Sequence, residues 1–135
     1  MHYLFVYEIS QCQNESDYAK LLSLSDKIIM TRLDGYSLFI HRDKQTPTIY
    51  KTNDSHDYVI GKLYCCVDET KFNELMAFFA NNEFEKKMVD IYFRDTNEMF
   101  NAYTYQKTNI DDYLSCDLHD YRDYLKNNKK YSYNV

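Results

Sequence analysis

The chain is poor in residues that interrupt regular structure, because its 135 residues include only two glycines and one proline. Its longest apolar runs, such as LFVY and LYCCV, are far too short to span a bilayer as a helix. No basic stretch followed by a long apolar segment opens the sequence, so we expect no secretion signal. These absences favour one soluble domain and no membrane partner.

An excess of basic charge is also lacking. The chain has 16 lysines and arginines against 21 aspartates and glutamates, which gives a formal net charge of −5. Proteins that coat phosphate backbones neutralise them with a basic face. We therefore expect no nucleic-acid partner.

Neither the cysteines nor the histidines have the spacing of metal ligands, and no CxxC pair occurs. We therefore expect no metal and no cofactor, and free, mostly buried thiols in place of disulfides. Free thiols predict a cytoplasmic protein. If the glycine-poor, tyrosine-rich composition reflects an AT-rich viral genome, the cytoplasm is that of the host. The four cysteines are Cys12, Cys65, Cys66 and Cys116, and the four histidines are His2, His41, His56 and His119.

Aromatic residues, by contrast, are abundant, with 15 tyrosines and 8 phenylalanines. Five segments rich in aromatic and β-branched residues predict strands. They cover Tyr3–Tyr7, Tyr36–His41, Tyr58–Val67, Met88–Phe93 and Phe100–Tyr105.

Two helices are predicted before the last strands. A short amphipathic segment begins at Glu15 and continues through Leu22. A longer helix is expected over Asp68–Ala80, with Asp68 as N-cap and apolar residues at helical spacing up to Phe79. Strands and helices in this order predict an α+β fold with a curved, barrel-like sheet.

A third helix is predicted over Asp111–Lys126, from an apolar stripe with acidic residues at its start and lysines near its end. Such a stripe must be covered. We therefore expect the helix either to pack on the sheet of its own chain or to offer this stripe to a partner, and we favour an interface with a protein partner or a second copy of the chain. The predicted interaction surface consists of Leu114, Leu118, Tyr121, Tyr124 and Leu125.

Several short motifs occur in an order that resembles one family. YEIS at residues 7–10 stands where that family has Tyr-Gly-Ser/Thr-Leu, and GYSLF at 35–39 matches its Gly-Tyr strand. VIGKLYCCVDE at 59–69 fits a Val-x-Gly-x-Leu-Tyr strand, and NAYTY at 101–105 fits the closing strand. By these motifs the chain resembles the γ-glutamylcyclotransferase-like family, which includes the AIG2-like proteins.

The resemblance extends from Tyr3 to about Tyr105. It implies a γ-glutamylcyclotransferase-like domain at residues 1–106. Residues 107–135 are then expected to be a C-terminal helical extension that packs on the same domain.

The resemblance also implies where a ligand would bind. In the family, the glycine of the first loop lets backbone N–H groups approach a ligand carboxylate. Glu8 stands in place of that glycine and adds a negative charge that repels an acidic substrate. We therefore interpret Tyr7, Glu8, Ile9 and Ser10 as a vestigial ligand-binding loop.

The family's general acid/base is a glutamate in a Leu-Asp-x-x-Glu pattern on the following helix. Counted without gaps from Leu75, Met76 replaces the aspartate and Phe79 replaces the glutamate. Because phenylalanine cannot exchange a proton, the resemblance predicts no catalytic residue here.

Three functions remain open from the sequence. The first is a catalytically inactive protein that works as a protein-interaction module. The second is an active γ-glutamyl cyclotransferase-type enzyme with a displaced carboxylate, for which Glu8, Glu83 and Glu85 are the candidates. The third is a protein that binds or sequesters a small ligand in the vestigial cavity.

Overall fold

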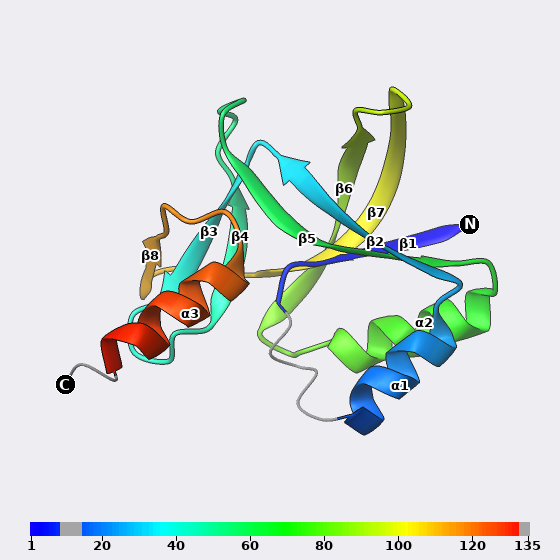
Figure 1. Ribbon diagram of the computed structural model, residues 1–135, viewed down its shortest axis with the longest axis horizontal. Coiled ribbons are helices and arrows are strands. Elements are labelled where there is room, and N and C mark those ends of the chain that lie inside the picture. Colours follow the sequence, from blue (N-terminus) through cyan, green and yellow to red (C-terminus); the bar gives the residue numbers. More distant parts are fainter. Residues whose placement is uncertain (9–14, 133–135) are drawn as a thin grey trace.

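The computed structural model describes residues 1–8 and 15–132, and within them three helices and eight strands form a mixed α+β fold (Figure 1). The expected fold class is therefore confirmed. The elements are β1 (His2–Val6), α1 (Glu15–Leu24), β2 (Lys27–Asp34), β3 (Tyr36–His41), β4 (Pro47–Lys51), β5 (Tyr58–Cys66), α2 (Glu69–Phe79), β6 (Phe84–Phe93), β7 (Glu98–Lys107), β8 (Tyr113–Ser115) and α3 (Tyr121–Ser132).

The strands form two sheets. The larger has the order β2-β5-β1-β7-β6, and β1 pairs antiparallel to β5 and parallel to β7. The smaller has the order β4-β3-β8. The two outer strands of the larger sheet, β2 and β6, come close to each other, so this sheet is strongly curled. None of the helices in the described ranges is long and apolar enough to cross a membrane.

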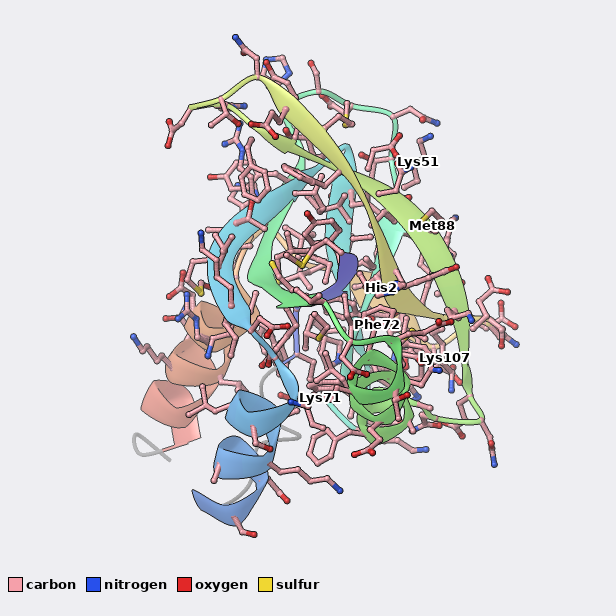
Figure 2. All side chains as sticks on the ribbon, turned by 90° about the vertical axis from the view of Figure 1, so that its right-hand side faces the viewer. His2, Lys51, Lys71, Phe72, Met88 and Lys107 are labelled. Carbon is pink, nitrogen blue, oxygen red and sulfur yellow. The ribbon has the colours of Figure 1, made fainter. Side chains whose placement is uncertain are left out.

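The core lies on both faces of the larger sheet, because successive side chains of a strand point to opposite sides. Phe5 of β1 and Tyr7, which follows the strand, belong to the cluster between the two sheets, whereas Leu4 and Val6 belong to the cluster beneath α1 and α2. Both helices lie on this second face, side by side (Figure 1). Figure 2 shows α2 beside the start of β1, where the His2 ring stacks on Phe72 at 5.1 Å.

Helix α2 forms as its sequence predicts. The Asp68 side chain accepts hydrogen bonds from the backbone N–H groups of Thr70 and Lys71, at 2.8 and 3.1 Å. Its apolar stripe, which includes Leu75 and ends at Phe79, is buried against the sheet. The helix therefore places its last residue, Phe79, at the edge of the core.

The predicted helix over Asp111–Lys126 is wrong in its extent. Residues Tyr113–Ser115 form β8, which pairs antiparallel to β3 with Leu114 opposite Ile40. Helix α3 begins only at Tyr121, after Asp120 accepts a 2.9 Å hydrogen bond from the Arg122 backbone. β8 forms backbone hydrogen bonds with the edge of β3 that lies opposite β4. This strand pairing outweighs the helical spacing of the apolar residues.

The cysteines agree in part with the expectation of free, mostly buried thiols. Cys65 and Cys66 are free and buried, and Cys116 is free and half-buried. Cys12 lies outside the described residues.

Gly61 gives a testable steric requirement. A Cβ atom at this position would lie 2.6 Å from the Val6 carbonyl oxygen and 2.7 Å from the Phe5 Cζ atom. We expect Gly61→Ala to lower the free energy of unfolding by about 2–3 kcal/mol, the cost of overpacking a core. Urea denaturation measures it.

Gly35 is the matched control. Its φ of +79° is unfavourable for alanine, but a Cβ atom there meets nothing within 4 Å. Gly35→Ala should therefore cost only the backbone strain, about 1–2 kcal/mol. A Gly61→Ala protein that is more stable than Gly35→Ala would contradict the close packing of β5 on β1.

We expect the Cys66 thiol to make the free energy of unfolding fall at alkaline pH. Burial, followed by the charge of Asp26, raises the pKa of its thiol to about 11. A raised pKa means that the contribution to stability is present below the unfolded pKa and is lost as pH rises through the folded pKa. We expect urea denaturation at pH 7 to 11 to show stability falling above pH 9, and falling less steeply in Cys66→Ala. An equal slope in both proteins would refute this assignment.

Candidate functional site

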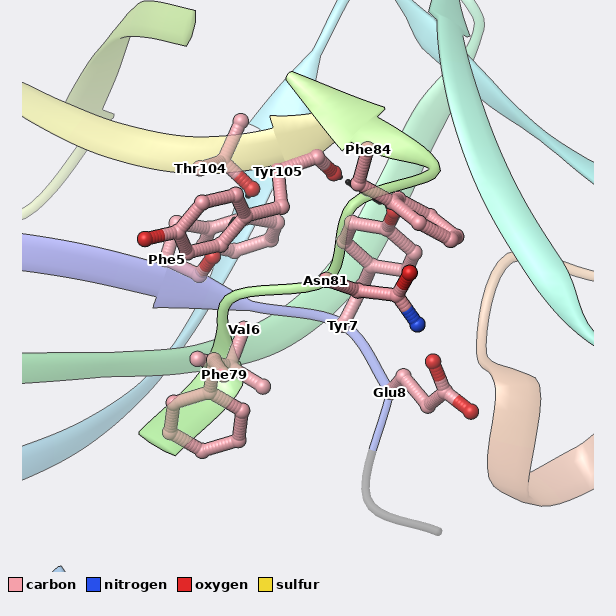
Figure 3. Close-up of a pocket in the computed structure, with 9 residues that line it drawn as sticks. All are labelled: Phe5, Val6, Tyr7, Glu8, Phe79, Asn81, Phe84, Thr104 and Tyr105. Carbon is pink, nitrogen blue, oxygen red and sulfur yellow. Dashed lines mark hydrogen bonds between the residues drawn. The ribbon is translucent and has the colours of Figure 1, made fainter. Parts of the chain in front are cut away.

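A small pocket opens where β1 and α2 end, beside Thr104 and Tyr105 of β7 (Figure 3). Only about 30 Å³ of it is open to a molecule the size of water. A single buried water needs about 10–15 Å³ by this measure, so the pocket has room for about two waters. Its lining residues are Phe5, Val6, Tyr7, Glu8, Phe79, Asn81, Phe84, Thr104 and Tyr105.

Phe79 helps to fill this pocket. It is the last residue of α2, is only 7% exposed, and packs against the Tyr64 ring at 5.8 Å and the Phe78 ring at 5.1 Å. Phe79 is therefore a core residue, at the end of the apolar stripe that the sequence predicts for this helix. The position that the resemblance gives to a catalytic glutamate therefore presents a hydrocarbon ring to this pocket.

The hydroxyl groups of Tyr7, Thr104 and Tyr105 around the pocket donate hydrogen bonds to backbone carbonyls. The Tyr7 hydroxyl donates to the Tyr105 carbonyl at 2.6 Å, and the Tyr105 hydroxyl donates to the Met76 carbonyl at 3.0 Å. Thr104 Oγ1 donates to the Phe5 carbonyl at 2.8 Å. Burial raises the pKa of both tyrosines above the ordinary value. The hydroxyl protons of both tyrosines are therefore engaged by backbone carbonyls of the fold.

Glu8 is the one carboxylate that the described residues bring to this pocket. Figure 3 shows it just beyond the end of β1, on the same side of the pocket mouth as Asn81. Burial, followed by the charge of Glu8, raises the pKa of Tyr121 to about 12. Glu8 is thus within electrostatic reach of α3. Ile9 and Ser10, the other half of the predicted loop, lie outside the described residues.

A wider polar groove adjoins the pocket and shares Glu8, Asn81 and Phe84 with it. About 390 Å³ of the groove is open to water-sized molecules. Lys107 Nζ lies 2.8 Å from Glu83 Oε2, and this hydrogen bond and charge hold the pKa of Glu83 below its usual value. Glu83 therefore lines the groove as part of an ion pair, whereas Glu85 lines neither cavity.

The five residues of the predicted interaction surface are separated by the fold. Leu114 is 54% exposed on β8, and Leu118 is half-buried in the following loop. Tyr121, Tyr124 and Leu125 instead lie against the core between the sheets. The hydroxyls of Tyr121 and Tyr124 both bond Gln45, at its carbonyl and its side-chain oxygen, at 2.9 and 2.7 Å.

Sequence reasoning missed part of the pocket lining. Phe84 and Asn81 follow α2, in a segment whose asparagines, glutamates and lysines are typical of an exposed turn. Tyr105 was visible as the last tyrosine of the closing NAYTY strand, and that motif was the available signal. Among the described residues, no group of three or more His, Cys, Asp or Glu side chains is placed to hold a metal ion.

Tyr105 provides a test of how the pocket is held together. Its hydroxyl satisfies a carbonyl in the last turn of α2. We expect Tyr105→Phe to lower the free energy of unfolding by about 1 kcal/mol, the usual net value of one such bond. Tyr92→Phe, which removes an exposed hydroxyl bonded to Asn97, should cost less in the same urea titration. Equal losses would argue against a specific role for the Tyr105 bond.

Solved structures with similar folds include proteins from a plant and from a bacterium. The solution structure of At5g39720.1 from Arabidopsis thaliana is 23% identical, with a TM-score of 0.63, and the match covers 96% of this chain and 83% of that one. The crystal structure of YkqA from Bacillus subtilis is 22% identical, with a TM-score of 0.64. The match covers 96% of this chain and 42% of that one.

A structure described as a gamma-glutamyl cyclotransferase is more distant. It is 14% identical, with a TM-score of 0.54, over 84% of this chain and 69% of that one. A search of curated proteins finds no match. The model of the family described as "Gamma-glutamyl cyclotransferase, AIG2-like" matches residues 4–126, a range that includes β8 and the first part of α3. The chain therefore belongs to the gamma-glutamyl cyclotransferase, AIG2-like family.

Proposed function

We propose that this chain is a catalytically inactive member of its family that acts as a protein-interaction module. The observation that carries the proposal is the pocket beside Phe79, which has about 30 Å³ of open volume and an aromatic lining. A γ-glutamyl group has far more atoms than two water molecules. It therefore has no room unless the aromatic side chains move.

The missing proton donor supports the same proposal. General acid–base catalysis contributes about 10²–10⁴ to a rate and requires a group within hydrogen-bond reach of the reacting atom. At the end of α2 that group is replaced by Phe79, and Tyr7 and Tyr105 already donate to backbone carbonyls. The pocket is thus better suited to stabilise the fold than to exchange protons.

Release of 5-oxoproline from a panel of γ-glutamyl amines and peptides tests the proposal. We expect no release above a protein-free control, while an active γ-glutamyl cyclotransferase in the same assay releases it. Phe79→Leu should be equally inactive. Release by the unmodified chain would reject the proposal.

Glu8 supports one alternative, an enzyme with a displaced carboxylate. It lines both the small pocket and the larger groove, so a substrate in the groove would meet its carboxylate. If the chain is an enzyme of this kind, Glu8→Gln abolishes 5-oxoproline release while Glu85→Gln, outside both cavities, leaves it unchanged. This pair of variants separates the two functions.

The partner surface in this proposal centres on β8. Leu114 is the exposed member of the predicted set, and β8 forms an outer edge of the smaller sheet. Leu114→Asp should weaken association with a partner or a second copy without loss of stability, measured by light scattering and thermal melts. A chain whose composition is typical of an AT-rich genome also fits a viral accessory role in the cytoplasm of a host cell.

A further inference from the structure

Strand β8 is an outer strand of the smaller sheet, and its second edge has no partner strand among the described residues. In Figure 1, β8 lies at the left side of the molecule, with β3 between it and β4. An unpaired edge offers backbone N–H and C=O groups to a further strand. An extended segment of another protein can therefore add to the sheet at this edge.

The hydrogen bonds on the β3 side identify which groups of β8 point outward. The Cys116 N–H and the Asp112 carbonyl bond backbone groups of β3 and of the residue after it, at 2.9 and 2.8 Å. Backbone groups alternate between the two edges along an antiparallel strand, so those of Tyr113 and Ser115 point to the free edge. The Tyr113 N–H donates to the Ile110 carbonyl at 2.9 Å. The groups left for a partner are thus the Tyr113 carbonyl and both backbone groups of Ser115.

The free edge is flanked by acidic side chains. Asp111, Asp112 and Asp117 are all exposed, and none of their carboxylates belongs to an ion pair within the described ranges. No lysine or arginine occurs in the sequence between Lys107 and Arg122. Opposite charges on neighbouring strands stabilise their pairing. The edge therefore favours an added strand that carries basic residues.

The same charges disfavour a second copy of the chain at this edge. Pairing of two β8 strands would bring the exposed aspartates of both copies together, and like charges on neighbouring strands are destabilising. The formal net charge of −5 adds a weaker repulsion between whole copies. A basic segment of a different protein meets neither obstacle.

We propose that β8 binds an extended, basic segment of a partner protein as an added antiparallel strand. This inference rests on the proposed role as an interaction module and names the kind of partner. Ser115 exchanges both of its backbone bonds with one residue of the segment, and the Tyr113 carbonyl accepts a bond from the residue two positions away. The residue between them lies opposite Leu114, which is 54% exposed, and packs against its side chain. Basic residues on either side then lie opposite Asp112 and Cys116, beside the acidic flanks.

The acetylated and amidated peptide Lys-Thr-Val-Thr-Lys is the probe, because its valine can lie opposite Leu114 while its threonine N–H groups bond the Tyr113 and Ser115 carbonyls. We expect it to cause saturable shifts of the amide signals of Tyr113–Ser115 in the ¹⁵N-labelled full chain. N-methylation of both threonines should weaken binding about tenfold, as for the loss of two hydrogen bonds. N-methylation of the valine, whose N–H points away from β8, is the matched control and should leave binding unchanged.

Amide hydrogen exchange locates the added strand. The Ser115 N–H points away from β3, so it should exchange faster than the Cys116 N–H, which donates to the Leu38 carbonyl. We expect the peptide to slow exchange at Ser115. Protection of Ser115 that depends on protein concentration in the absence of peptide would mean that a second copy occupies the edge, and would overturn the proposal.

Variants of the chain test the edge and its charge separately. Ser115→Pro removes the outward N–H, and proline is tolerated in an edge strand where the N–H faces away from the sheet. It should weaken peptide binding about tenfold, through the lost bond and the ring at the edge, whereas Ser115→Ala keeps the N–H and should bind normally. Asp112→Asn should weaken binding about two- to fivefold, as for an exposed ion pair. Asp95→Asn, exposed in the turn between β6 and β7, is its matched control and should have no effect.

The proposal is wrong if the peptide causes no shift at β8 or shifts only other residues. Equal binding of Glu-Thr-Val-Thr-Glu, equal binding after N-methylation of the threonines, or unchanged binding by a folded Ser115→Pro chain would also overturn it. Failure here is distinct from failure of the proposed function. If Leu114→Asp weakens association with a protein partner while the peptide does not bind β8, the interaction module stands and strand addition is excluded.

Discussion

Phe79→Glu is expected to destabilise the protein by about 3–5 kcal/mol, the cost of leaving a charge buried without a partner. The new carboxylate would lie at a position that is 7% exposed, among aromatic rings and already-bonded hydroxyls. At about 3 °C per kcal/mol for a domain of this size, the melting temperature should fall by about 10 °C or more. Thermal melts at neutral pH measure this loss.

The pH dependence of this variant identifies the cause. A carboxyl buried in apolar surroundings has a raised pKa, so the stability deficit should be small in acid and grow as pH rises from the unfolded pKa to the folded pKa. Phe79→Leu keeps an apolar side chain and should cost less than about 1.5 kcal/mol at any pH. An unchanged melting temperature in Phe79→Glu would mean that the position faces an open, wet cavity.

Tyr121→Ala is the second large effect, and we expect a loss of about 3–5 kcal/mol, typical of deleting a buried aromatic side chain. Tyr121 is 4% exposed, belongs to the core between the sheets and stacks on Tyr124 with ring centroids 5.9 Å apart. Its removal would detach the start of α3 from the smaller sheet. Chemical denaturation of the full chain measures the loss.

The matched variant Tyr121→Phe keeps the ring and removes only the hydroxyl that bonds the Gln45 carbonyl. It should cost about 1 kcal/mol. If Tyr121 belonged to a partner surface, as the apolar stripe first suggested, Tyr121→Ala would leave the isolated chain as stable as before and weaken only its association.

Local patterns predicted the elements in which one signal dominates. Helix α2 has a side-chain N-cap and an unbroken apolar stripe, and Tyr36–His41 alternates between buried and half-buried residues as a strand should. Both were found at their expected places. The start of α3 also had a local signal, because Asp120 precedes Tyr121 as a capping residue does, but the longer apolar stripe obscured it.

Other elements depend on pairing partners distant in sequence. Strand β2 carries exposed or half-buried residues at most positions and is defined by its ladder with β5, and β8 is only three residues long. The position of Phe79 at the pocket could be predicted through the family motif. The size of the pocket could not, because it depends on how Phe84 and Tyr105, from β6 and β7, pack around it.

Binding of 5-oxoproline to the unmodified chain tests the central claim most directly, because it asks whether the pocket beside Phe79 admits the cyclised γ-glutamyl group. In an NMR titration of the ¹⁵N-labelled protein, we predict no concentration-dependent shift of the amide signals of Phe5–Glu8, Asn81–Phe84 and Thr104–Tyr105. Saturable shifts confined to these amides would show that the pocket accepts the ligand, and would contradict the claim that aromatic side chains have closed it.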